Sequence, residues 1–353
     1  MTVAEERKQL VNRLFPQGFP QLWCPLIVHY TSEGKIDPVR IRKHLVRISP
    51  YVRSFLIFGS TGDGWELSLA EKTELFACYV ELAKELDLNL LIGVLKHQTE
   101  EVETEISYWL QRLTKLSNQT GPLEAMAACH VVGFTVCPPR GADLSQTVIV
   151  DALARILSRG LPVALYQLPQ VTQNEISPET LYRLARDYPH FFMFKDTSGQ
   201  DQVLLAGLDY AGVRFVRGME GDYSRWYRAG QSGYDGFLLS SANCFAADLQ
   251  QLIKLADQGK NDEADRLSAR ISDLIAAVFA DVATIISGNA FANANKCIDH
   301  ILAYGLDWKV QSPPFLHSGQ PVPVQHLSYA RQALEEHGWS ADSGYLTATQ
   351  NRS

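Results

Sequence analysis

The sequence has no excess of basic residues and no basic cluster. Its 32 Lys and Arg are outnumbered by 39 Asp and Glu, which gives a formal net charge of −7. Binding to the phosphates of nucleic acids needs Lys and Arg gathered on one face of the protein. The sequence therefore predicts no nucleic-acid partner.

Long apolar runs are also absent. The longest, Leu274 to Ile286, is interrupted by Asp281 and is shorter than the roughly 20 residues that span a bilayer. The N-terminal segment MTVAEERKQLVNRLF mixes both charge signs and has no apolar core of a signal peptide, so a short helix is expected there. We therefore predict no membrane segment and no secretion signal.

Closely spaced cysteines are missing as well. The six cysteines are scattered through the chain without a Cys-x-x-Cys pair, and most lie in apolar surroundings. This spacing is typical of reduced core thiols rather than of disulfides or a zinc site. We expect a cytoplasmic protein with no bound metal.

The chain does contain enough apolar residues, 46%, to bury a large core. Short apolar runs recur along it, each followed by a segment with helical spacing, which is the pattern of β/α units around a parallel sheet. Most runs show little polar alternation, as expected for strands that are buried on both faces. The eight predicted strands are 22–28, 55–58, 90–94, 131–136, 163–165, 191–194, 213–216 and 236–239.

The segments between these runs predict helices, because their apolar residues recur every three or four positions. Eight β/α units predict an α/β fold, a closed (β/α)8 TIM barrel with additional C-terminal helices, whose active site lies after the carboxyl ends of the strands. The predicted helices are 38–48, 69–86, 100–116, 145–157, 178–187 and 223–229, followed by 247–256 and 262–278.

The organisation along the chain follows from this pattern. We expect an N-terminal helical extension over residues 1–17, the barrel over 18–245, and helices packed on the barrel over 246–311. Residues 312–353 form a C-terminal extension that includes a helix-like stretch and a frayed tail of about ten residues. Residues 117–124 are expected to be an extra loop on the rim opposite the active site.

The end of the sixth strand carries a candidate nucleophile. Lys195 directly follows the apolar run 191–194, and partial desolvation there would lower its pKa toward that of a nucleophilic amine, as Schiff-base chemistry requires. The alternative is a structural lysine that reaches the barrel rim or pairs with Asp196. Lys96, after the third strand, lies in a more polar context and is expected to have a surface role.

Two neighbouring features would complement this lysine. Tyr166 ends the fifth strand, where a phenol can transfer protons as a general acid and base, or can simply plug the barrel mouth. The second strand leads into a glycine-rich segment whose Ser60 and Thr61 supply hydroxyl donors suited to a carboxylate. A glycine-rich connector without function would look similar.

Several motifs in order resemble one family, the pyruvate-type class I aldolases that include dihydrodipicolinate synthase and N-acetylneuraminate lyase. GSTGDGWELSLAEK (59–72) resembles the family's Gly-Thr-Thr-Gly-Glu loop, LPVALYQLP (161–169) its Tyr-Asn-x-Pro segment, and FKDTSG (194–199) its Schiff-base segment. The likeness extends from about Gly18 to Phe315, including GKID (34–37) and GYDGFLLSSAN (233–243).

The resemblance implies roles for particular residues. Lys195 would form the imine, Tyr166 would relay protons, and Ser60 with Thr61 would bind the carboxylate and extend the relay. Gly218 and Leu238 match positions that line the substrate pocket. The resemblance also implies a homo-oligomer, a dimer or tetramer, and no cofactor, because the lysine itself serves as the electron sink.

Two departures from the family pattern bear on the second substrate. Where the synthases carry Pro-Tyr-Tyr after the fourth strand, this chain has Pro138-Pro139-Arg140, and Arg140 could contact an anion or be a solvated surface residue. Val171 stands in the segment where many synthases place a carboxylate-binding Arg, and an aliphatic side chain cannot hold an anion. We therefore expect an acceptor other than the usual semialdehyde.

These features predict a lyase or synthase that makes or cleaves a C–C bond between pyruvate, or a related 2-oxo acid, and an aldehyde. One alternative uses the same imine to dehydrate a 2-keto-3-deoxy sugar acid. Another is a non-catalytic paralogue that binds a metabolite, which the missing tyrosine and arginine would favour. Trapping of an imine on Lys195 would separate the last alternative from the first two.

Overall fold

A computed structural model describes residues 1–227 and 233–347 of the chain. Eight parallel strands close into a barrel in sequence order, with β8 hydrogen-bonded back to β1, so the predicted (β/α)8 fold is confirmed. The strands are β1 (Leu22–Pro25), β2 (Ser54–Ile57), β3 (Asn89–Val94), β4 (Val131–Val136), β5 (Val163–Gln167), β6 (Phe191–Asp196), β7 (Arg214–Arg217) and β8 (Gly236–Leu238).

The helices that follow the strands agree closely with the helical spacing of the sequence. Ser68 caps α3 in the predicted capping box with Glu71, and Ser177 caps α8 ahead of Pro178. The helices up to β8 are α1 (Val3–Leu14), α2 (Pro38–Ile48), α3 (Leu69–Leu86), α4 (Thr99–Ser117), α5 (Pro122–Ala128), α6 (Gln146–Leu157), α7 (Pro169–Thr172), α8 (Pro178–Asp187), α9 (Gln202–Leu205) and α10 (Tyr223–Trp226), with the 3-10 turn η1 (Ser60–Gly62).

The first strand is shorter than predicted. The apolar run continues to Val28, but the sheet ends at Pro25 and residues 26–28 are buried outside it. The backbone N–H of Ile27 donates to the Asn243 side chain at 3.1 Å instead of to a neighbouring strand. A side-chain acceptor that lies far along the sequence therefore ends the strand, which apolar content alone does not reveal.

Several helices differ from the sequence prediction. The segment predicted as an extra loop over residues 117–124 turns into α5 at Pro122, which occupies the first helical position. Helix α13 (Ala290–Tyr304) was not predicted, because it is buried on most sides and carries Asn, Lys, Asp and His at buried positions. Apolar residues do recur at helical spacing, at Phe291, Ala294, Ile298 and Ile301, but buried polar residues lie between them. The predicted helix 223–229 is helical to Trp226, and its last two residues lie outside the described part of the chain.

Helix α1 packs across the N-terminal side of the barrel. Val11 and Phe15 join the apolar cluster that fills the barrel interior. Arg7 is fully buried, and its guanidinium donates to backbone oxygens of α8, β6 and the segment before β7, among them Phe191 at 2.5 Å and Tyr188 at 2.8 Å. A single arginine thereby satisfies carbonyl groups that the ends of these elements leave unpaired.

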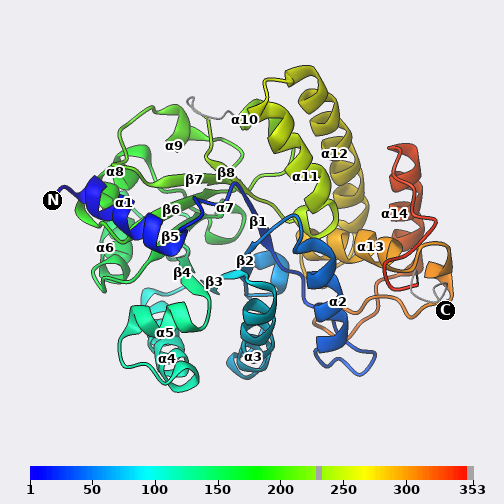
Figure 1. The fold of residues 1–353 in the computed structure, drawn as a ribbon, viewed down its shortest axis with the longest axis horizontal. Helices are drawn as coiled ribbons and strands as arrows, with labels where there is room; N and C mark the ends of the chain where they lie inside the picture. Colours follow the sequence, from blue (N-terminus) through cyan, green and yellow to red (C-terminus); the bar gives the residue numbers. More distant parts are fainter. Residues whose placement is uncertain (228–232, 348–353) are drawn as a thin grey trace.

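The helices after β8 gather on one side of the barrel, away from the N-terminus (Figure 1). Helix α11 bends at Phe245, where the expected boundary between the barrel and the later helices falls. The frayed tail expected at the C-terminus lies mostly in residues 348–353, outside the described part. These helices are α11 (Ala242–Asp257), α12 (Asn261–Val282), α13 and α14 (Val324–Glu336), with the 3-10 turn η2 (Leu306–Lys309).

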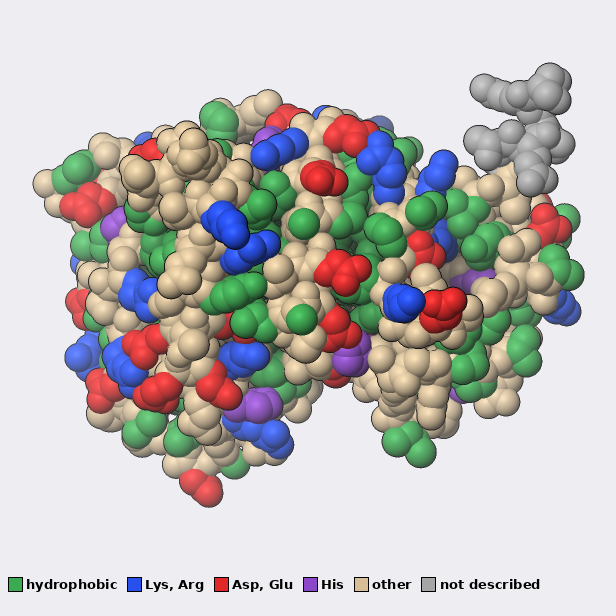
Figure 2. Space-filling view, turned by 90° about the horizontal axis from the view of Figure 1, so that it is seen from below, with side chains coloured by type: hydrophobic (Ala, Val, Ile, Leu, Met, Phe, Trp, Pro, Cys, Tyr) green, Lys and Arg blue, Asp and Glu red, His purple; other side chains and the backbone are tan. Residues whose placement is uncertain are grey.

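The distribution of surface charges and the state of the cysteines agree with the sequence composition. Acidic and basic side chains are interspersed over the face shown in Figure 2, without a patch of one sign. All six cysteines are free, and five of them are buried. Among the described residues, no helix is both long and apolar enough to cross a membrane.

Candidate active site

Lys195 lies near the carboxyl end of β6, inside the barrel mouth. Its side chain is 4% exposed, and its Nζ lies 3.9 Å from the centre of the Tyr166 ring. Burial lowers the pKa of Lys195 to about 7, although the nearby Cys137 and Glu220 oppose the shift. About half of the amine is therefore neutral near pH 7, as a nucleophile must be.

Tyr166 is held beside the lysine by strand pairing. The two residues are direct partners in the β5–β6 ladder, so their side chains point to the same face of the sheet. Burial, with a contribution from Cys137, raises the pKa of the Tyr166 phenol, while the hydroxyls of Ser60 and Thr197 oppose the increase. The phenol is therefore protonated at neutral pH and can donate a proton at this position.

The hydroxyl loop meets these two residues from β2. Ser60 and Thr61 begin η1 and are 7% and 5% exposed. The first N–H groups of a helical turn have no partner inside the turn, and here two hydroxyls lie beside them. The Asn289 side chain donates to the Ser60 carbonyl at 2.9 Å, which ties the loop to the start of α13.

Gly218 lies against the lysine at the end of β7. A Cβ atom on this residue would lie 2.6 Å from Lys195 Cε and 2.2 Å from Thr197 Oγ1. The backbone N–H of Gly218 donates to the Asp196 carbonyl at 2.6 Å, which holds the close approach. Only glycine leaves space for the lysine side chain in this position.

The remaining predicted residues lie on other elements around the barrel. Leu238 on β8 is buried in the apolar cluster of the barrel interior, together with Val216. Arg140, on the loop after β4, is exposed, and its backbone N–H donates to the His97 carbonyl at 3.0 Å. Lys96, for which a surface role was expected, is partly exposed and pairs with the buried Glu105 at 3.1 Å.

Glu220 is a candidate site residue that the sequence prediction missed. Its carboxylate accepts hydrogen bonds from Ser240, Ser241 and Tyr223 at 2.7 to 2.9 Å and is only partly buried. It also raises the pKa of Lys195 against the effect of burial. In the sequence, the only indication of a site role was its position two residues after Gly218. The fold shows that Ser240 and Ser241, just after β8, hold the carboxylate in place.

Trp65 was also missed, because it lies within the glycine-rich segment. Its indole Nε1 donates to Ser60 Oγ at 2.9 Å, and its ring stacks on His97 at 4.9 Å with an interplanar angle of 15°. An indole N–H can only donate. The Ser60 hydroxyl can therefore direct its own proton toward Tyr166.

A buried ionic network supports the loops after β6 and β7. The Arg217 guanidinium contacts both carboxylate oxygens of Asp201, at 3.0 and 3.2 Å. Tyr234 donates to Asp201 at 2.6 Å and lies 3.4 Å from Asp196, the residue after the lysine. Such a bidentate pair fixes geometry as well as charge. The lysine thus extends from a rigid strand end.

Comparison with known proteins agrees with this arrangement. The model of the dihydrodipicolinate synthetase family matches residues 19–295, which include every site residue described above. The chain belongs to the dihydrodipicolinate synthetase family. It is therefore a member of a family of aldolase-type lyases.

The similar proteins are distant. The 4-hydroxy-tetrahydrodipicolinate synthase of Stenotrophomonas maltophilia is 26% identical over 250 residues, which cover 70% of this chain and 77% of that protein. The dihydrodipicolinate synthase of Cyanidioschyzon merolae, solved with lysine bound, has a TM-score of 0.69 at 19% identity and covers 91% of this chain and 98% of its own. A prophage protein of the same family from Escherichia coli, solved with pyruvate, has a TM-score of 0.68 at 16% identity, with 90% and 98% covered. The two structures establish the fold.

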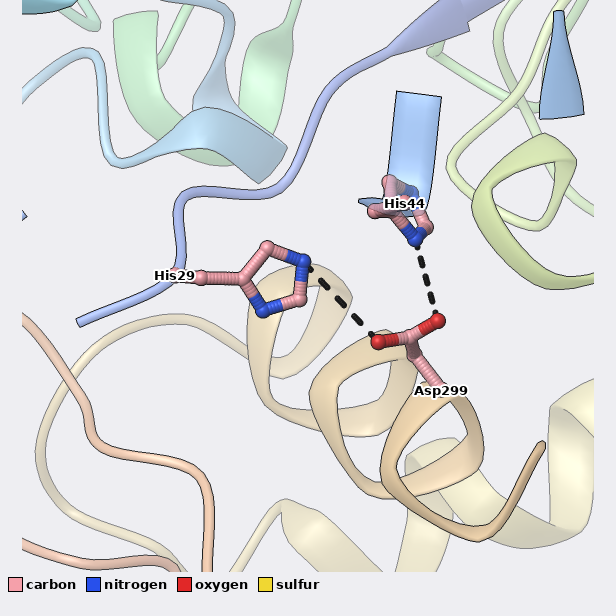
Figure 3. Close-up of side chains that lie close together, drawn as sticks. All are labelled: His29, His44 and Asp299. Carbon is pink, nitrogen blue, oxygen red and sulfur yellow. Dashed lines mark hydrogen bonds and ion pairs between the residues drawn. The ribbon is translucent and has the colours of Figure 1, made fainter. Parts of the chain in front are cut away.

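A second polar cluster lies outside the mouth, where β1, α2 and α13 meet. His29, His44 and Asp299 bring potential metal ligands within 4.8 Å of one another (Figure 3). However, the Arg40 guanidinium already contacts Asp299 at 2.6 Å, and His44 bonds Asp299 and Asn243 through its two ring nitrogens. His44 and Asp299 are therefore accounted for as part of a hydrogen-bonded network between α2 and α13, whereas His29 lies 3.9 Å from Asp299 and its Nε2 has no hydrogen-bond partner among the described residues.

Proposed function

We propose that this member of the family is a Schiff-base-forming lyase or synthase that acts on pyruvate or a closely related 2-oxo acid. The observation that carries the proposal is Lys195, a buried strand-end lysine with a pKa of about 7 and a phenol at 3.9 Å. A structural lysine acts through its charge, which burial here disfavours. A nucleophilic amine needs the neutral form that this burial favours.

The chemistry follows from the positions of three side chains. The neutral Lys195 amine attacks the keto carbon, and loss of water from the carbinolamine gives an iminium ion. Tyr166 supplies the proton that the departing hydroxyl needs and takes it back later. The hydroxyls of Ser60 and Thr61 hold the carboxylate of the 2-oxo acid at the start of η1.

The iminium ion then acts as an electron sink. Loss of a proton from the adjacent carbon gives an enamine, which attacks the carbonyl carbon of an aldehyde and forms the C–C bond. Water hydrolyses the resulting imine and returns the free Lys195 amine. Cleavage is the same sequence in reverse, and no step requires a group beyond the lysine as electron sink.

The proposal is tested by trapping the imine. The purified protein is incubated with pyruvate and sodium borohydride, digested, and mapped by mass spectrometry. We expect the reduced adduct on the peptide that contains Lys195, and none on that peptide in Lys195→Met. Lys96→Met serves as the matched control and should trap normally. If wild-type protein forms no adduct on Lys195, the proposal is wrong and a non-catalytic binding role is favoured.

Assembly is a further part of the proposal. We propose a homo-oligomer, as expected from the family resemblance, with Arg140 in the loop where the synthases carry the tyrosine that reaches a neighbouring subunit. Light scattering of the purified chain measures its mass directly. A monomer at micromolar concentration would contradict this expectation.

A further inference from the structure

The barrel mouth after β3, β4 and β5 is formed by apolar side chains. Leu95, Cys137 and Leu168 are 1%, 4% and 1% exposed and cluster there with the site tyrosine. Trp65 and Val171 pack against this cluster and are only partly buried, so they form its open face. We call these five residues, without the tyrosine, the apolar wall.

The apolar wall borders the reacting centre. Tyr166 belongs to the same cluster and pairs with Lys195 across β5 and β6. Cys137 lies close enough to Lys195 for the two groups to influence each other's pKa. A molecule bound to the lysine amine therefore has the wall on the side of the fourth and fifth strands.

Three polar side chains around the wall are bonded within the protein, whereas the Arg140 side chain is exposed on the loop after β4. The Gln170 amide, beside Val171, donates to the Thr197 carbonyl at 3.0 Å. Lys96 pairs with Glu105, and the indole N–H of Trp65 is taken by Ser60. The wall thus presents surface that favours apolar groups and offers a carboxylate no partner of its own.

Trp65 gives the wall a flat and fixed surface. One edge of its indole is held by Ser60, and one face is stacked on His97. Aromatic rings pack well against such a surface in offset or edge-to-face geometry. Glu220, the acidic group of the mouth, is on the opposite side of the barrel and is held by residues after β8.

We propose that the apolar wall is the acceptor subsite and that the acceptor is an uncharged aldehyde with an aromatic substituent. The inference rests on the proposed Schiff-base function. The enamine carbon attacks the aldehyde carbon, the aldehyde oxygen takes its proton from Tyr166, and the substituent lies against Trp65 and Val171. Hydrolysis releases a 4-hydroxy-2-oxo acid with the aromatic group on the hydroxyl-bearing carbon.

Competing acceptors test the inference. Pyruvate is supplied with benzaldehyde, glyceraldehyde or succinic semialdehyde, and kcat/KM for condensation is followed by product mass. Apolar contacts typically discriminate by about 10- to 200-fold, so we expect benzaldehyde to exceed glyceraldehyde by at least about tenfold. For succinic semialdehyde we expect a kcat/KM about 100-fold below that for benzaldehyde, because its carboxylate would be desolvated.

A charge placed in the wall should change this order. In Val171→Arg we expect the ratio of benzaldehyde to succinic semialdehyde to fall at least about tenfold, since the guanidinium can pair with the carboxylate. Val148→Arg is the matched control, because Val148 is 46% exposed on α6, and it should keep the wild-type ratio.

The outcomes distinguish this inference from the proposed function. If pyruvate is trapped on Lys195 but glyceraldehyde or succinic semialdehyde is preferred, or no aldehyde condenses, the acceptor inference is wrong and the Schiff base stands. A preference for succinic semialdehyde that Arg140→Gln abolishes would place the acceptor at Arg140 instead. If pyruvate is not trapped, both proposals fail.

Discussion

Gly218→Ala tests whether the space beside the lysine is a catalytic requirement. The new methyl carbon would lie 2.6 Å from Lys195 Cε, whereas carbon atoms in contact are separated by about 3.5 Å or more. The lysine side chain must therefore move by roughly 1 Å. A misplacement of that size can cost about 100-fold in rate, which corresponds to about 2.7 kcal/mol in the activation free energy of the proposed reaction.

Stability should change less than reactivity in this variant. The closest atoms belong to side chains, Lys195 Cε near the end of a flexible chain and Thr197 Oγ1, which moves with χ1, and the Asp196 carbonyl oxygen lies at 3.3 Å. We expect borohydride trapping with pyruvate to slow by about 100-fold while the thermal midpoint remains within a few degrees.

Gly160→Ala is the matched control for this variant. Gly160 has a φ of +71° and nothing within 4 Å of an added Cβ, so alanine there strains the backbone by about 1 to 2 kcal/mol and leaves the site intact. We expect reduced stability with normal trapping, the opposite pattern. Normal trapping by Gly218→Ala would refute the reasoning.

Three further predictions follow from the same structure. The trapping rate should rise with pH around a midpoint near 7, since burial lowers the pKa of Lys195 and only the neutral amine reacts; a midpoint near 10 would contradict this. Arg7→Met should lower the free energy of unfolding in urea by at least about 3 kcal/mol, because several buried carbonyls lose their donor, whereas the exposed Arg13→Met should change it by less than about 0.5 kcal/mol. Burial and Arg40 hold the pKa of His29 well below its usual value of 6.5, so the unfolded chain binds a proton that the native chain does not. Stability should therefore decline as pH falls below about 6.5, and His29→Gln should reduce this decline by up to about 1.4 kcal/mol per pH unit; an unchanged slope would count against the prediction.

Local sequence was sufficient for most of the barrel and for its central pair of residues. Strands such as 131–136 and helices such as 69–86 carry their own apolar runs and caps, so their bounds follow from neighbouring residues. Lys195 and Tyr166 end adjacent strands, and parallel pairing brings such ends together at one rim. Their closeness was therefore predictable without the structure.

Residues whose roles depend on distant partners were not predictable in this way. Helix α13 is buried on most sides, so its polar residues concealed it until the elements around it were known. The early end of β1 depends on Asn243, more than 200 residues away, and the position of Glu220 depends on Ser240 and Ser241. None of these contacts produces a periodic pattern of residues from which it could be predicted.

The sequence by itself determined the barrel and the placement of a lysine, a phenol and a hydroxyl loop at one rim, because these follow from short-range periodicity and the geometry of parallel strands. Only the tertiary structure decided how far burial lowers the pKa of the Lys195 amine, and which side chains form the walls of the mouth. Burial and packing are properties of side chains that meet from separate strands. The tertiary structure alone brings Trp65 and Val171 together against the cluster that contains Tyr166.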